Sequence, residues 1–480
     1  MLFNSFEFLV FLIIVFALYW FVFNKKLKHQ NILLLGSSYL FYGWWDYRFL
    51  SLILFSTLVD YFVGLAIEKS KKNRKRKLLL LVSLVFNLGL LGFFKYYNFF
   101  VDSFIELIQS VGYSTESTWS LYIILPVGIS FYTFQTMSYS IDVYRGNLKP
   151  TTDFVSFAAF VSFFPQLVAG PIERASHLLP QILRSRTFSY EKGMQGLRLI
   201  LWGLIKKVVI ADTLAIKVDD IFENYAFFGG GVLWLGAIYF AIQIYCDFSG
   251  YSDIAIGVSK LFGIELKSNF KFPYFSRNIG EFWRRWHISL STWFRDYLYI
   301  PLGGSKGSKW ISLRNIFIIF LVSGFWHGAN LTFIVWGGIH ALLFVPGYIL
   351  GSNRKYTSAI VAESSWYPSI KELFQISVTF LVVILAWVFF RSDTLQMAFE
   401  YLTLMFTKID FPLMHKNGLY SVASLLVLDW IFRKDERLNF TFLKTIDKRI
   451  VLLLEVVSVI FAVYLISLNS NSGQFIYFQF

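Results

Sequence analysis

The segment SGFWHGANL, residues 323–331, places one histidine, His327, between two strongly apolar runs. A buried imidazole loses its hydration, so it needs either a polar partner or a chemical role. Its ordinary pKa of about 6.5 suits it to accept a proton near neutral pH, as a general base does. The structural alternative is a histidine that only joins two helices by hydrogen bonds.

The apolar run that ends at Trp326 predicts a helix of about 12–15 residues, or roughly 20 Å, which is too short to cross a bilayer alone. We therefore expect the chain to break at residues 328–330, within the depth of the membrane. A break at that depth would place His327 beside a buried cavity or channel.

A second stretch, residues 272–305, gathers arginines and aromatic residues around another histidine, His287. No helix breaker lies between residues 279 and 298, so one uninterrupted amphipathic helix at the membrane interface is expected. Residues 264–314 contain nine Lys or Arg against three Asp or Glu, an excess that attracts anions such as phosphates. Anchoring to lipid headgroups is the alternative role. The residues expected to bind an anionic donor are Trp283, Arg284, Arg285, Trp286 and Arg295.

Histidines, cysteines and carboxylates nowhere show the spacing of metal ligands, so no metal site is predicted. The single cysteine, Cys246, excludes an intramolecular disulfide and is expected to pack in the core. Asp247 and Asp253 lie near the end of a predicted span, where they are expected to cap the short helix that follows.

The elements that position these residues must lie in a membrane. Of the 480 residues, 56% are hydrophobic and 15% charged, and the mean hydropathy is +0.56; in soluble domains about a quarter of residues are charged. We predict an all-α polytopic membrane protein with about 11–12 transmembrane helices. The predicted spans are residues 5–23, 31–46, 49–67, 78–96, 120–140, 194–211, 231–248, 315–326, 330–350, 371–391, 418–432 and 450–468. Two interrupted apolar segments, 154–169 and 250–264, are expected to be re-entrant.

The distribution of basic residues predicts the orientation of the chain. Residues 24–30 and 68–77 are strongly basic and should face the cytoplasm, which places the N-terminus outside. The formal net charge of +14 therefore does not require a nucleic acid as partner. Neither a linker nor a clear repeat divides the sequence, so residues 1–480 are expected to form a single membrane domain.

Three segments together resemble the membrane-bound O-acyltransferase (MBOAT) family. They are FFPQLVAGPIERASHLLPQI at residues 163–182, NFKFPYFSRNIGEFWRRWHISLSTWFRDYLYIPLGG at 269–304, and SGFWHGANLTFIVWGGIHALL at 323–343. The likeness extends over nearly the whole chain and is greatest to the bacterial branch that O-acetylates alginate or D-alanylates teichoic acid. It implies that His327 is catalytic and identifies His287 as the second motif histidine, which is likewise expected to be catalytic. Leu331 departs from the family, in which Trp is common at this place, and this affects only local packing.

The resemblance implies an enzyme that moves an acyl group, most simply acetyl, from a cytoplasmic thioester to a hydroxyl outside the bacterial cytoplasmic membrane. The hydroxyl would belong to a polysaccharide or to a partner protein that passes the group on. The donor would be acetyl-CoA or an acyl carrier protein, and no bound cofactor is implied. Donor and acceptor would meet at His327 through a central tunnel, and Gly328 and Asn330 are candidates to support the oxyanion.

Other functions remain open from the sequence. D-alanyl transfer to teichoic acid is an alternative within the same family. A transporter or flippase for a lipid-linked sugar would use His327 for gating or proton coupling, but it predicts inverted repeats, which the sequence does not show. A purely structural subunit would tolerate the loss of His327.

Overall fold

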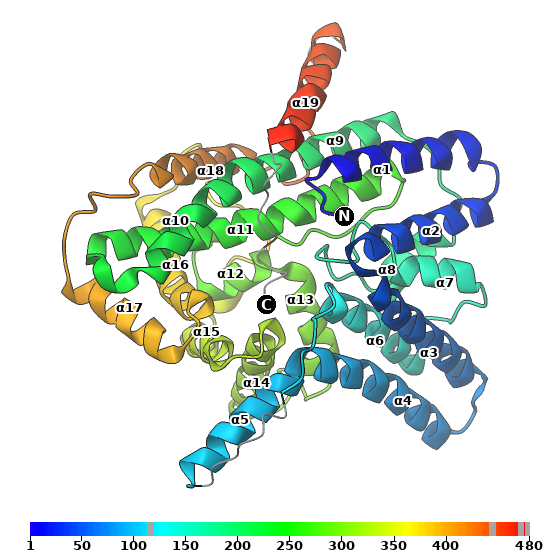
Figure 1. Ribbon diagram of the computed structural model, residues 1–480, viewed down its shortest axis with the longest axis horizontal. Coiled ribbons are helices and arrows are strands. Elements are labelled where there is room, and N and C mark those ends of the chain that lie inside the picture. Colours follow the sequence, from blue (N-terminus) through cyan, green and yellow to red (C-terminus); the bar gives the residue numbers. More distant parts are fainter. Residues whose placement is uncertain (113–119, 441–447, 469–474, 476–480) are drawn as a thin grey trace. The chain divides into compact units, whose positions relative to one another are not determined.

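A computed structural model describes residues 1–112, 120–440, 448–468 and 475 (Figure 1). Every regular element among these residues is a helix, which confirms the all-α prediction. By their internal contacts the residues form two compact units. Unit 1 comprises Met1–Leu2, Glu7–Ser189 and Leu261–Leu266, and unit 2 comprises Phe3–Phe6, Tyr190–Lys260 and Lys267–Phe480.

In unit 1, apolar helices are joined by a polar cluster that surrounds one buried carboxyl group, that of Asp60. This side chain accepts hydrogen bonds from Ser83, from the Asn87 amide at 2.7 Å and from Ser140 at 2.5 Å. Such bonds between helices satisfy polar groups where water cannot reach. The helices are α1 (Phe6–Ala17, of which the first residue belongs to unit 2), α2 (Leu27–Asp46), α3 (Leu50–Lys69), α4 (Asn73–Leu91), α5 (Tyr97–Ser110), α6 (Ile129–Arg145), α7 (Phe154–Val161) and α8 (Ala175–Ile182).

Unit 2 carries both candidate histidines, and its longest helix is α11 (Gly230–Leu261), all of which except the last residue belongs to this unit. Before α11 come α9 (Tyr190–Leu204), the π-helix η4 (Ile205–Ala211) and α10 (Asp212–Glu223). After it follow η6 (Pro273–Phe275), α12 (Ile279–Arg285), α13 (Ile288–Phe294), η7 (Arg295–Tyr299), α14 (Lys309–His327), α15 (Leu331–Ile349), η8 (Ser352–Arg354), α16 (Ile370–Arg391), α17 (Leu395–Thr407), α18 (Gly418–Phe432) and α19 (Lys448–Leu468).

Two aspartates of α11 pair with lysines instead of capping a helix. Asp253 lies 2.5 Å from the Lys206 ammonium, and Asp247 lies 2.6 Å from that of Lys207. Both lysines belong to η4 and are buried. The capping prediction is wrong because the helix does not end at residue 248: it continues through both aspartates to Leu261.

Six helical stretches among the described residues are long and apolar enough to cross a membrane: Leu27–Lys69, Asn73–Ser110, Gly230–Leu261, Lys309–His327, Leu331–Ile349 and Ile370–Arg391. Shorter apolar helices occur at Phe6–Val22, Gly418–Phe432 and Leu453–Ser467. Leu27–Lys69 has 43 residues and contains two of the predicted spans, separated by a 3-10 turn at Tyr47–Phe49. The figure of 11–12 crossings stays a prediction.

Two sequence-based expectations about these helices are wrong. Residues 250–261, expected in a re-entrant segment, continue α11 as one helix of 32 residues. The helix that carries His327 has 19 residues, or about 28 Å, because it begins at Lys309 with Ser308 as its N-cap. The prediction was too short because the first turn of this helix is polar and was not counted as part of it. A short helix therefore does not explain why the chain breaks after His327. The apolar segment 154–169 is interrupted as expected, since α7 ends at Val161 and turns follow, and its re-entrant course in the membrane stays a prediction.

Candidate active site

His327 lies at the last position of α14, where this helix forms a tight hairpin with α15 (Figure 1). Gly324 and Gly337 let the two backbones approach closely: a Cβ on Gly337 would lie 3.0 Å from the carbonyl carbon of Phe320 and 3.4 Å from Cα of Gly324. Such contact between small residues is typical of membrane helix pairs. The hairpin therefore fixes the position of His327, because α14 carries this residue and α15 packs closely against α14.

The His327 imidazole is buried among aromatic rings. Its centroid lies 5.0 Å from that of Trp326, 5.3 Å from Trp336 and 5.4 Å from Phe390. The centroid of the His287 ring lies 6.3 Å away. The structure thus brings together the two histidines, 40 residues apart in the sequence, in water-poor surroundings where electrostatic interactions are strong.

His287 interrupts the helix that was expected to run from residue 279 to 298. Helix α12 ends at Arg285, and His287 adopts a left-handed conformation with φ +43° before α13 begins. A positive φ is uncommon outside glycine, and strained residues of this kind cluster at functional sites. The sequence pattern concealed the break, because neither proline nor glycine marks it.

The side chains around this break do not form an interfacial anchor. Phe282, Trp286 and Trp293 are buried within unit 2, and Trp286 packs on Trp387 with ring centroids 5.1 Å apart. The prediction of an amphipathic surface helix is therefore wrong. These aromatic side chains hold the segment of His287 against the core helices.

The fully buried His287 ring is fixed by Asn269. The Asn269 side-chain oxygen lies 3.1 Å from Nδ1 of His287. It also accepts hydrogen bonds from the Ser289 amide at 3.2 Å and the Ser289 hydroxyl at 2.9 Å. Burial lowers the pKa of His287 to about 3, so the ring is neutral at physiological pH.

A cavity of about 580 Å³ lies in unit 2 beside this segment. Its cationic lining residues are Arg284, Arg295, Lys309 and Arg354, and its aromatic ones are Trp283, Phe294, Tyr299, Phe320 and Tyr348. Among the described residues that line it, Leu290 and Ser323 lie three or four positions from a candidate histidine, whereas His287 and His327 themselves are not included. The cavity lining therefore includes residues close in sequence to each histidine without including either histidine.

Of the five predicted donor-binding residues, Trp283, Arg284 and Arg295 line this cavity. Arg284 donates hydrogen bonds to the carbonyls of Asn353 at 2.6 Å and Tyr356 at 3.4 Å, and burial lowers its pKa. Arg295 pairs with its neighbour Asp296 at 2.7 Å. Lys309, Arg354 and Tyr299 were missed, although the first two lie in short basic segments of the sequence, Lys309 at the start of α14 and Arg354 at the end of η8.

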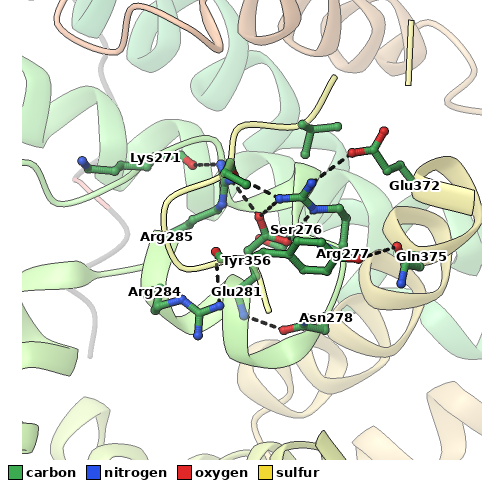
Figure 2. A network of polar contacts seen from close by, with 12 residues as sticks. Lys271, Ser276, Arg277, Asn278, Glu281, Arg284, Arg285, Tyr356, Glu372 and Gln375 are labelled. Carbon is green, nitrogen blue, oxygen red and sulfur yellow. Dashed lines mark hydrogen bonds and ion pairs between the residues drawn. The ribbon is translucent and has the colours of Figure 1, made fainter. Parts of the chain in front are cut away.

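Arg285 and Trp286 are not among the lining residues. Figure 2 shows Arg285 directed instead at Glu281, whose carboxylate lies 2.8 Å from both Arg285 and Arg277. Arg285 also donates to the Ala359 carbonyl at 3.0 Å. Burial lowers the pKa of Arg277, but the hydrogen bonds and charges of Glu281 and Glu372 together outweigh burial, so the pKa is raised. This network ties α12 to the segment after α15.

The two candidate oxyanion donors differ in the hydrogen bonds that they already make. Asn330 is the N-cap of α15: its side-chain oxygen accepts from the Thr332 amide at 3.0 Å, and its nitrogen donates to the Asp393 carbonyl at 2.8 Å. Both polar atoms of its side chain are thus already hydrogen-bonded within the protein. Gly328 directly follows His327 in extended backbone and is buried. Within the described part of the chain, no three His, Cys, Asp or Glu side chains gather as a metal site would require.

Comparison with known proteins finds the same family. A sequence profile of the membrane-bound O-acyltransferase family matches residues 147–357, a range that includes both histidines and the cavity lining. The chain is 43% identical to the probable alginate O-acetylase AlgI of Pseudomonas syringae over 408 residues, which are 83% of this chain and 75% of that protein.

Relatives with other acceptors also match. The peptidoglycan O-acetyltransferase of Helicobacter pylori is 38% identical over 404 residues, covering 79% of this chain and 74% of that protein. The teichoic acid D-alanyltransferase of Bacillus subtilis is 30% identical over 262 residues, covering 51% of this chain and 62% of that protein. All three are named for the transfer of an acyl group.

Proposed function

Because the chain belongs to the membrane-bound O-acyltransferase family, and is therefore a membrane-bound O-acyltransferase, we propose that it acetylates hydroxyl groups of an extracytoplasmic polysaccharide. The relatives with the greater identity and coverage are named as O-acetylating enzymes, which favours acetyl over D-alanyl as the transferred group. Membership of an acyltransferase family argues against a transporter or a purely structural subunit.

The observation that carries the proposal is the pairing of two buried imidazoles, with ring centroids 6.3 Å apart, beside a cationic cavity. His327 is the general base that removes the proton of the acceptor hydroxyl. The hydroxyl oxygen then bonds to the thioester carbonyl carbon, and the backbone N–H of Gly328 stabilises the resulting oxyanion. The carbon–sulfur bond breaks, and the proton held by His327 passes to the leaving thiolate.

The cavity accommodates the thioester donor in this proposal. Arg284, Arg295, Lys309 and Arg354 supply positive charge for phosphate groups, and the aromatic lining receives apolar parts of the donor. Acetyl-CoA and the phosphopantetheine of an acyl carrier protein both carry phosphate, so both are substrates to test. Side-chain movement at Leu290 or Ser323 would connect the cavity to the histidines as a tunnel.

The proposed setting is the bacterial cytoplasmic membrane, with the N-terminus outside and the cavity open to the cytoplasm. The basic segments 24–30 and 68–77 support this orientation. The acceptor approaches from the opposite side, either as the polysaccharide itself or as a secreted or membrane-anchored partner protein that carries the acetyl group onward.

Transfer of radiolabelled acetyl groups from a thioester to cell-surface polysaccharide tests the proposal. Cells with His327→Ala should lose transfer, whereas His29→Ala, outside the candidate site, should retain it at equal protein level. Parallel assays with labelled acetyl-CoA, acetylated carrier protein and D-alanylated carrier protein identify the donor. Normal acetyl transfer by His327→Ala would contradict the catalytic assignment, and transfer of D-alanine alone would contradict the assigned acyl group.

A further inference from the structure

Asn269 is a buried residue that contacts His287 and the first residues of α13 that follow it. Its backbone carbonyl accepts from the Ile288 amide at 2.9 Å, and Lys271 N–H donates to the Arg285 carbonyl at 2.9 Å. The segment 269–271 therefore lies directly along the break between α12 and α13. Only 1% of Asn269 is exposed, so its amide must be satisfied by protein groups.

The contacts of this amide settle which of its atoms faces the histidine. The atom 3.2 Å from the Ser289 backbone nitrogen must be an acceptor, because a backbone N–H can only donate. That atom is therefore the Asn269 oxygen, and the nitrogen points to the Ser252 hydroxyl at 3.3 Å. The orientation of the amide thus follows from the chemistry of its neighbours.

The same oxygen determines where the proton of His287 resides. Nδ1 of His287 lies 3.1 Å from an oxygen that can only accept, so Nδ1 must carry the hydrogen. A neutral imidazole has one N–H, and Nε2 therefore bears the lone pair. This edge of the ring is opposite to Asn269, and the ring's neighbours include Trp326, at 5.9 Å between centroids, and His327.

We propose that Asn269 is a positioning residue that holds His287 in the Nδ1–H tautomer, so that Nε2 offers the acyl-transfer site a hydrogen-bond acceptor. This inference rests on the proposed function. His287 then orients the acceptor by accepting a hydrogen bond from a hydroxyl next to the attacking one, and it cannot donate to the oxyanion. The two histidines thus have separate tasks: His287 holds the acceptor through this neighbouring hydroxyl, and His327 removes the proton of the attacking hydroxyl.

Three substitutions separate this role from simple packing. Asn269→Leu removes the acceptor at similar volume, so both tautomers of His287 become accessible, and kcat should fall about 10- to 100-fold with the donor KM unchanged. Asn269→Asp keeps an acceptor and adds a negative charge, which raises the pKa of His287, so the acidic limb of the kcat–pH profile should move upward. Ser252→Ala, the matched control, removes only the partner of the amide nitrogen and should retain kcat.

The tautomer itself can be read by ¹⁵N NMR of the full-length protein labelled at its six histidines, with His287→Gln to assign the signal. The expected spectrum shows protonated Nδ1 and unprotonated Nε2 in the native protein and in Asn269→Asp, and a changed ratio in Asn269→Leu. Protonated Nε2 in the native protein, or an unchanged ratio in Asn269→Leu, would overturn the inference.

If Asn269→Leu does not fold, the pH profile of Asn269→Asp decides: an unmoved acidic limb overturns the inference. Failure of the proposed function has a different signature. In that case His327→Ala and His287→Gln would transfer acetyl groups normally, whatever tautomer the spectrum shows.

Discussion

At the scale of single residues, the candidate catalytic histidines could be recognised from the sequence, whereas the contacts that hold them in place could not. His327 and His287 are both recognisable from their motifs, and the structure places their rings 6.3 Å apart. Asn269 was not recognised, because no local pattern connects it with a histidine 18 positions later. A hydrogen bond between distant segments becomes visible only once the chain is folded.

The buried neutral state of His287 predicts a pH dependence of stability. Its pKa is lowered from 6.5 to about 3 by burial, so between these values the unfolded chain binds a proton that the folded chain does not. Its contribution to stability is thus complete above pH 6.5 and decreases as the pH falls toward 3, by about 1.4 kcal/mol per pH unit. The melting temperature in detergent should therefore decrease from pH 7 to pH 5 less steeply in His287→Gln than in the native protein. Equal slopes would contradict a neutral buried imidazole.

The place of Arg354 in the cavity lining leads to a prediction about the affinity for the donor. It is exposed and lines the cavity, so Arg354→Glu should raise the KM for the thioester donor. The effect should be larger at low ionic strength, because salt screens charges beyond about 10 Å at 0.1 M. Steady-state kinetics at two salt concentrations measure it. Lys371→Glu changes an exposed charge that does not line the cavity and should leave KM unaltered; a salt-independent loss in Arg354→Glu would argue against electrostatic capture.

At the scale of elements, most helices could be predicted because long apolar runs dominate the sequence. The predicted span 418–432 coincides with α18, and 371–391 differs from α16 by a single residue. One error has a tertiary cause. Residues 250–264 contain glycine and aspartate, yet α11 continues to Leu261, and Lys206 and Lys207 pair with its carboxylates at Asp253 and Asp247. Tertiary contacts of this kind override local preferences.

The hairpin of α14 and α15 predicts that substitutions of two adjacent glycines differ strongly in their effect on activity. Gly337→Ala would place a methyl group against the Phe320 backbone and should displace α14, reducing acyl transfer. In Gly338→Ala the new Cβ meets only a Leu321 methyl carbon at 3.7 Å, so activity should be retained. Labelled-acetyl assays at matched protein level compare the two, and equal activities would show that the close approach does not position His327.

The ion-pair network of α12 predicts a stability effect. Glu281→Gln leaves the buried Arg277 and the largely buried Arg285 without the carboxylate that both contact, and removal of one partner of a buried pair costs about 3–5 kcal/mol. Asp296→Asn removes the partner of the mostly exposed Arg295, where about 0–1 kcal/mol is expected. Thermal unfolding in detergent should show a clearly larger decrease for Glu281→Gln; similar decreases would mean that the network does not stabilise α12.

At the scale of the whole molecule, composition alone identifies a helical membrane protein, and the motifs identify its family. The cavity could not be predicted, since its lining comes from α12, α13, α14, α15 and the loops between them. Short basic segments of the sequence contain Lys309 and Arg354, but only folding brings them into the same cavity lining as Trp283. Orientation in the membrane depends on loop charge and stays a prediction.

That orientation can be tested by cysteine labelling, because the single native cysteine is buried. Lys71→Cys, in a basic segment, should react with a membrane-impermeant maleimide only after the cells are permeabilised. Counting the predicted spans from an outside N-terminus places residues 392–417, between the spans 371–391 and 418–432, on the outside. Lys416→Cys should therefore react in intact cells. The reverse pattern would invert the proposed arrangement of donor and acceptor sides.

The lysine–aspartate pairs of unit 2 also bear on biogenesis. Lys206 and Lys207 are synthesised 47 and 40 residues before Asp253 and Asp247. Lys207 also pairs with the nearby Asp212 at 2.9 Å, whereas the aspartate partner of Lys206 comes only with α11. An unpaired charge opposes the insertion of a membrane helix, by about 2.5–3.5 kcal/mol at the helix centre. We therefore expect the segment of α9 and η4 to insert most favourably together with α11, so that Lys206 enters the lipid as one half of a neutral pair.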